Sequence, residues 1–171
     1  EELMAHDQLL YQYIRSDASP TGQWHVDVPS GLTVVERQVA NSDTDEYDAE
    51  SFTRFATNRA KEIDAVCIRS QPEIQEPTRS SLNHDKARYV GSGVFDDEEV
   101  FLVEAKTSKD ELFKGLGQLE AYSTHFQEYW TPESVEKLLV LLGAEADAYI
   151  EEIRGELPVR LVDIPDVSAL G

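Results

Sequence analysis

The stretch FLVEAK at residues 101–106 decides which fold the chain is expected to adopt. It is an apolar run typical of a buried strand, and it carries two charges near its end. Because side chains alternate along a strand, Glu104 and Lys106 share one face while Val103 and Ala105 point to the other. A carboxylate and an ammonium there are unfavourable unless they pair with each other or bind something. A structural ion pair and a functional site are therefore the two interpretations.

A second buried charge lies upstream, in the segment EIDAV at residues 62–66. The pattern predicts a strand that places Asp64 between apolar neighbours. One interpretation is a hydrogen bond from Asp64 to a neighbouring loop. The other is a shared site with Glu104 and Lys106.

The rest of the chain predicts eight elements in the order α-β-β-β-α-β-α-β. Helices are expected at residues 2–15, from Ser108 onward and at 146–154, and strands at 32–39, 60–69, 100–106, 137–143 and 158–164. Residues 16–30 are expected to be loop, and 71–93 a long insertion between the second and third strands. Antiparallel hairpins come before parallel crossovers, so residues 1–171 are expected to form one α/β domain. Its central sheet is mixed, with helices on its faces.

These charges suit the hydrolysis of a phosphodiester. The reaction needs a metal ion to neutralise charge and to generate hydroxide, and Mg²⁺ prefers oxygen ligands. Asp64 and Glu104 would be ligands, with the backbone carbonyl of Ala105 as a third. Lys106 would orient or deprotonate the attacking water and stabilise the charged transition state.

The helix after this strand carries Gln118 and Tyr122 in the pattern Q-x-x-x-Y. Together with Asp64 and E-x-K at 104–106, this pattern resembles the PD-(D/E)XK (restriction-endonuclease-like) nuclease superfamily over roughly residues 2–142. The chain departs from the family pattern because no proline precedes Asp64 and because the Asp64–Glu104 spacing is long.

The resemblance implies a three-layer α/β/α fold and a Mg²⁺-dependent (endo)nuclease in which Mn²⁺ could substitute. It implies metal ligation by Asp64 and Glu104, catalysis by Lys106, and a supporting or substrate-contacting role for Gln118. Members often carry a glutamate on the first helix, where Glu2, or less favourably Glu1, stands in this chain.

Nucleic acid is the expected partner, with DNA favoured over RNA, and the sequence leaves homodimer formation open. Basic side chains suited to phosphate contacts are few. The candidates for nucleic-acid binding are Arg59, Lys109, Lys114 and Tyr122, with Arg54 and Lys61 as further basic residues near the proposed face.

The charge balance is strongly acidic. Thirty-four Asp and Glu face fifteen Lys and Arg, for a formal net charge of -19. Because the acid is spread along the whole chain, a halophile's surface is favoured over a DNA mimic or an acidic partner-binding surface. Concentrated salt would let such a protein approach nucleic acid. A single cysteine, Cys67, and the lack of a long apolar run favour a cytoplasmic protein.

Two other functions compete with the nuclease. One is a catalytically inactive module of the same fold that acts through its acidic surface as an interaction or inhibitor protein. The other is a plain α/β binding domain in which the three charged residues coincide by chance. Metal-dependent cleavage would separate the nuclease from the other two.

Overall fold

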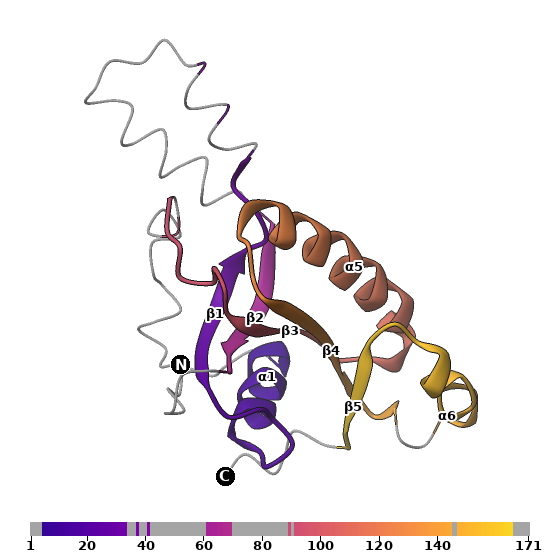
Figure 1. Ribbon diagram of the computed structural model, residues 1–171. Helices are drawn as coiled ribbons and strands as arrows, with labels where there is room; N and C mark the ends of the chain where they lie inside the picture. Colours follow the sequence, from indigo (N-terminus) through magenta and orange to yellow (C-terminus); the bar gives the residue numbers. More distant parts are fainter. Residues whose placement is uncertain are drawn as a thin grey trace.

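A five-stranded mixed sheet forms the centre of the computed structural model, which describes residues 5–33, 37, 41, 61–69, 89, 91–144 and 147–165. Its strands are β1 (Gln23–Pro29), β2 (Glu62–Ile68), β3 (Glu99–Lys106), β4 (Ser134–Leu142) and β5 (Arg160–Ile164). They lie side by side in chain order, as Figure 1 shows. β1, β2 and β3 pair antiparallel, whereas β3, β4 and β5 pair parallel. The predicted mixed sheet is therefore confirmed.

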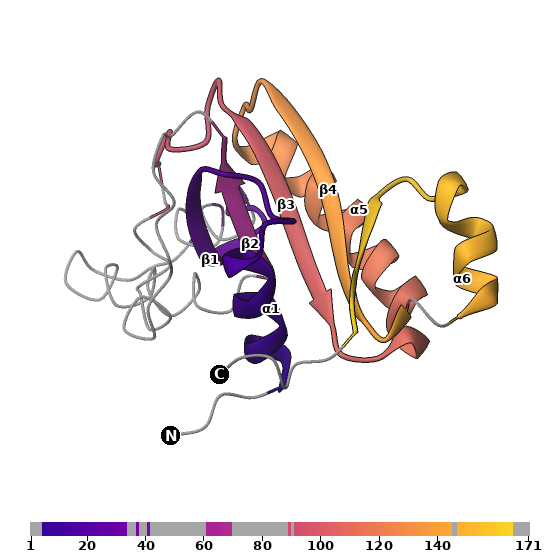
Figure 2. The same cartoon turned by 90° about the horizontal axis from the view of Figure 1, so that it is seen from below.

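Helices cover both faces of this sheet. They are α1 (Ala5–Arg15), α5 (Leu112–Tyr129) and α6 (Ala148–Ile153), with the short 3-10 helices η2 (Lys109–Glu111) and η4 (Arg154–Glu156). α1 lies on one face, whereas α5 and α6 lie on the other (Figure 2). Among the residues that the structure describes, no helix is long and apolar enough to cross a membrane.

Two apolar cores separate the layers. Along β3, Val100 and Leu102 belong to the core under α5, whereas Phe101, Val103 and Ala105 belong to the core under α1. This alternation is the one expected from the sequence. It directs Glu104 and Lys106 to the face covered by α5.

The N-terminal part of the sheet corrects two predictions. Residues 16–30 are not all loop, because β1 occupies Gln23–Pro29 with Trp24, Val26 and Val28 buried. The strand predicted at 32–39 is wrong where the chain is described, since Thr33 and Arg37 are helical. The alternating apolar residues of β1 were hidden by Pro20, Pro29 and the aspartates, which are common in turns.

The other predicted strands and helices are confirmed to within a few residues in the described ranges. Glu1 and Glu2 lie outside the described residues, as do Arg54, Arg59 and nearly all of the insertion predicted at 71–93. Tyr89 and residues 91–93 are its described part.

Candidate active site

The site begins where β2 and β3 part. Their antiparallel register pairs Ala65 with Val103, so the next step places Asp64 opposite Glu104. At that step side chains take over the hydrogen bonding. The Asp64 N–H donates to Glu104 Oε1 at 3.1 Å, and the Ala105 N–H donates to Asp64 Oδ2 at 2.8 Å. Each carboxylate is thus fixed by the backbone of the opposite strand.

Glu104 is the more deeply buried of the two acids. It is 3% exposed, whereas the Asp64 side chain is 17% exposed. Burial and then the negative charge of Asp64 raise the pKa of Glu104 to about 9, while the Lys106 charge opposes this rise. Both effects favour the protonated form of Glu104 in the metal-free protein, because burial and a nearby like charge disfavour the ionised carboxylate.

His6 reaches this pair from the opposite face of the sheet. Its Nε2 lies 2.9 Å from Asp64 Oδ2, and its Nδ1 lies 3.4 Å from Asp7 Oδ1. The hydrogen bond to Asp64 raises the pKa of His6 to about 9, although burial acts against it. At neutral pH the imidazolium therefore donates to the same oxygen that accepts from Ala105.

The sequence does not point to this contact, because His6 falls at a helical spacing with the apolar residues Leu9, Leu10 and Tyr13 and so resembles one more position of a buried helix face. A titratable side chain on such a helix face is itself a signal that a charged partner faces it.

Asp27 is a further acid that the sequence did not single out. Within β1 it has a φ of 51°, a left-handed conformation that is uncommon outside glycine, although asparagine and aspartate adopt it more often than other residues. Its neighbours Val26 and Val28 pair with Ala65 and Ile63, which places Asp27 beside Asp64. Burial, then Glu62, Asp64 and Asp7, raise its pKa to about 7. The cluster of carboxyl groups thus extends from the Asp64–Glu104 pair onto β1.

Helix α5 brings Tyr122 and Gln118 to the same place. Burial raises the pKa of Tyr122, the charges of Glu104 and Asp64 raise it further, and a hydrogen bond from Gln118 lowers it. The phenol therefore lies within electrostatic reach of both carboxylates. The Gln118 Oε1 atom is buried without a hydrogen-bond partner in the structure, so it is available to a bound group.

The approach of α5 depends on Gly115. A Cβ atom built there would lie 2.7 Å from Leu139 Cδ1 and 3.3 Å from Lys106 Cγ. The missing side chain of Gly115 thus makes room for the stem of Lys106 under the helix. A Cβ atom built at Gly117 would meet nothing within 4 Å, so Gly117 is not needed for the close approach of α5 to the sheet.

Two of the remaining predicted basic residues, Lys109 and Lys114, lie near the start of α5. Lys109 Nζ is 3.4 Å from Asp147 Oδ2, and Lys114 Nζ is 3.8 Å from Glu111 Oε2. Both lysines are exposed, and such pairs are weak enough to exchange for a phosphate. Lys61 is exposed at the start of β2.

Carboxylate oxygens dominate the donors that the site offers to a metal. Within the described ranges, no three His, Cys, Asp or Glu side chains stand ready to hold an ion. Asp64 and Glu104 form a two-carboxylate pair, which suits a hard cation such as Mg²⁺ that keeps several waters. Burial, and after it the negative charge of Asp64, raise the pKa of Glu104, and a bound dication would favour the ionised carboxylate against both effects.

Comparison with known proteins gave no relatives. No family model, no curated protein and no solved structure matches the chain.

Proposed function

We propose that the protein is a metal-dependent nuclease that hydrolyses phosphodiester bonds, with DNA as the favoured substrate. The observation that carries the proposal is the meeting of Asp64 and Glu104 across two neighbouring strands. Lys106 lies on the same face of β3 as Glu104. Tyr122 of α5 lies within electrostatic reach of both Asp64 and Glu104. An isolated ion pair would need neither the second carboxylate nor the helix.

The fold proposed with it is the restriction-endonuclease-like three-layer α/β/α arrangement. It is supported by the element order α1-β1-β2-β3-α5-β4-α6-β5 and by a sheet that is antiparallel first and parallel afterwards. Without a matching family or structure, this assignment rests on the elements and on the residues of the site.

Asp64 and Glu104 would hold the ion, and the Ala105 carbonyl would be a third ligand. A bound Mg²⁺ supplies charge neutralisation at the phosphate and lowers the pKa of water. Lys106 would orient the attacking water and stabilise the negative charge that develops at phosphorus. Gln118 and Tyr122 would contact the substrate, and Lys109 and Lys114 would contact its phosphates.

The test is a cleavage assay on linear, branched and single-stranded DNA and on RNA, in molar KCl, with Mg²⁺, Mn²⁺ or EDTA. We expect cleavage that requires the metal ion and disappears in Asp64→Asn. The matched control is Asp110→Asn, which removes one exposed carboxylate from η2 and should leave cleavage unchanged. If no substrate is cut and calorimetry detects no metal binding, the inactive acidic module replaces the enzyme.

A further inference from the structure

A hollow lies at the opposite end of the sheet, away from Asp64 and Glu104. It has a volume of about 610 Å³ and is lined by Ala18, Ser19, Pro20, Thr21, Arg69, Phe101, Glu136 and Arg160. Phe101 lies near the start of β3, whereas Glu104 and Lys106 lie at its end. The hollow is therefore a separate feature and not an extension of the candidate active site.

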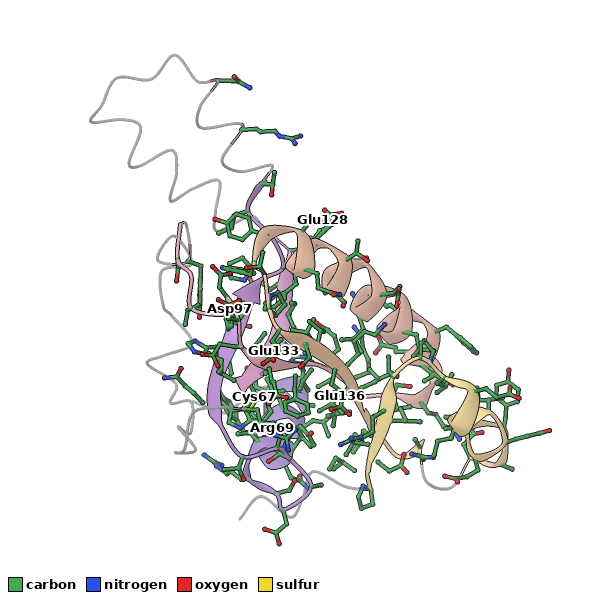
Figure 3. All side chains as sticks on the ribbon, viewed as in Figure 1. Cys67, Arg69, Asp97, Glu128, Glu133 and Glu136 are labelled. Atoms are coloured by element: carbon green, nitrogen blue, oxygen red, sulfur yellow. The ribbon has the colours of Figure 1, made fainter. Side chains whose placement is uncertain are left out.

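The sheet itself builds this hollow. The register across β1, β2, β3 and β4 aligns Trp24, Cys67, Phe101 and Glu136 in one row on the face covered by α1. Cys67, Arg69 and Glu136 are labelled in Figure 3, on the side where α1 packs. The segment after α1 closes the row, since the Cys67 thiol donates to the Pro20 carbonyl at 3.9 Å.

Two arginines give the hollow a positive balance in a strongly acidic chain. Arg160 donates to Glu136 Oε1 at 2.5 Å, so the charge of this arginine is neutralised by an acid within the wall. Arg69 makes no side-chain hydrogen bond or ion pair with the described residues, and the Thr21 hydroxyl likewise has no such partner there. With one acid against two arginines, the wall carries one positive charge in excess.

Arg69 and Thr21 together offer more hydrogen-bond donors than a ligand with one carboxylate group could accept from. A guanidinium offers five N–H donors in a planar fork, and Thr21 adds a hydroxyl. A phosphate monoester brings close to two negative charges and three acceptor oxygens, which match this set better than two carboxylate oxygens.

A buried donor that is not used lies behind the wall and is not itself part of the lining. Tyr13 of α1 is 0% exposed and its hydroxyl has no hydrogen-bond partner in the structure. Burial raises the pKa of Tyr13, while the Arg160 charge lowers it and that of Glu136 raises it, so the hydroxyl lies within electrostatic reach of both. A buried hydroxyl without a partner is uncommon and calls for an explanation, and a nearby ligand is one.

We propose that this hollow binds a small phosphate-bearing molecule, with Arg69 as its main phosphate contact and Phe101 and Pro20 as the wall for its uncharged part. The volume exceeds what a phosphate ion needs and lies within the range of small-molecule sites. The proposal is independent of the nuclease activity, because none of these residues belongs to the Asp64–Glu104 site.

The test is calorimetric titration of the full chain with AMP, inorganic phosphate and adenosine. EDTA is present throughout, so that no metal ion recruits a phosphate to Asp64 and Glu104. We expect AMP to bind more tightly than phosphate, and adenosine to bind weakest, since the charge supplies most of the affinity. Adenosine binding as tightly as AMP would overturn the assignment of a phosphate site.

The decisive variant is Arg69→Gln, which should lower AMP affinity roughly tenfold or more, the usual effect of losing a charge-assisted hydrogen bond. The matched control is Lys137→Gln, which removes the same charge from β4 at a lysine paired with Glu120 of α5. Its AMP affinity should remain that of the wild type. The proposal fails if the wild type binds neither AMP nor phosphate up to roughly 10 mM. It fails equally if Arg69→Gln binds AMP as well as the wild type does.

Discussion

Asp64 and Lys106 have different tasks in the proposed reaction, and single substitutions should separate them. Asp64→Asn weakens a metal ligand, so Mn²⁺ affinity and cleavage should fall together. Lys106→Ala removes a positive neighbour of Glu104, so metal binding should persist or strengthen while cleavage falls by roughly 10²–10⁴-fold. Calorimetry and single-turnover cleavage measure the two quantities.

The structural ion-pair interpretation predicts a different pattern for the same variants. In that case Lys106→Ala leaves Glu104 unpaired and mainly lowers the free energy of unfolding. Lys137→Ala provides the control for removing a lysine from the neighbouring strand β4. If Lys106→Ala loses stability and the wild type binds no metal, the catalytic role of Lys106 is wrong.

His6 should make stability depend on pH in the metal-free protein. Its pKa rises from 6.5 to about 9 on folding, because the imidazolium donates to Asp64. A raised pKa means that folding takes up a proton. The contribution is therefore complete below pH 6.5 and is lost as pH rises toward 9. Since the His6 side chain is 40% exposed, solvent screening keeps the effect modest.

Urea unfolding of the wild type and His6→Gln between pH 6 and 9.5, in EDTA, measures this effect. The difference in unfolding free energy between the two proteins should shrink as pH rises. His125→Gln is the control, because His125 is exposed on α5. A difference that stays constant over this range would show that the His6–Asp64 contact is not ionic.

Some residues of the site could be predicted from the sequence and others could not. Asp64 and Glu104 could be predicted, because each is a charge within an apolar strand and a strand period fixes its face. His6 and Asp27 could not, since their roles depend on α1 packing against the sheet and on the register between β1 and β2. Such contacts between distant segments are not encoded in local spacing.

At the scale of the element, the two glycines of α5 should respond to substitution in opposite ways. Gly115→Ala forces a methyl group against Leu139 and Lys106, which should cost about 1–3 kcal/mol and lower cleavage by shifting the lysine. Gly117→Ala meets open space, so it should stabilise the helix by about 0.5–1 kcal/mol. Each variant is thus the control for the other in urea unfolding. Equal stabilisation by both would mean that α5 does not lie as close to the sheet as described.

Strand β1 shows why elements are harder to predict than single charges. Its buried residues alternate over Trp24, Val26 and Val28. Pro20 before the strand, Pro29 at its end and Asp27 within it nevertheless favour a turn. The segment after it carries β-branched residues, yet Thr33 and Arg37 are helical. Tertiary pairing with β2 outweighed local propensity in the first case, as sheet formation commonly does.

At the scale of the whole molecule, the net charge of -19 should make stability depend on salt. In dilute buffer the carboxylates repel one another, and molar KCl reduces the Debye length to about 3 Å. Thermal melts from low to molar KCl should therefore show a rising midpoint. For a chain of this length, each 2–4 °C of rise corresponds to about 1 kcal/mol. Sucrose at matched osmotic strength is the control, because it favours compactness without screening charge. A midpoint that does not rise with KCl would remove the argument for a halophilic surface and favour an acidic interaction protein.

The chain-ordered sheet has a consequence for synthesis on the ribosome. Each strand pairs with the one made just before it, so the sheet can grow from one edge as the chain emerges. Asp64 and Glu104 need only β2 and β3 to meet, because the hydrogen bonds that fix both acids lie between these two strands. Until β4 arrives, however, β3 presents an open and largely apolar edge, which is where nascent chains aggregate. The acidic residues between these strands would then protect the unfinished protein through mutual repulsion between neighbouring chains.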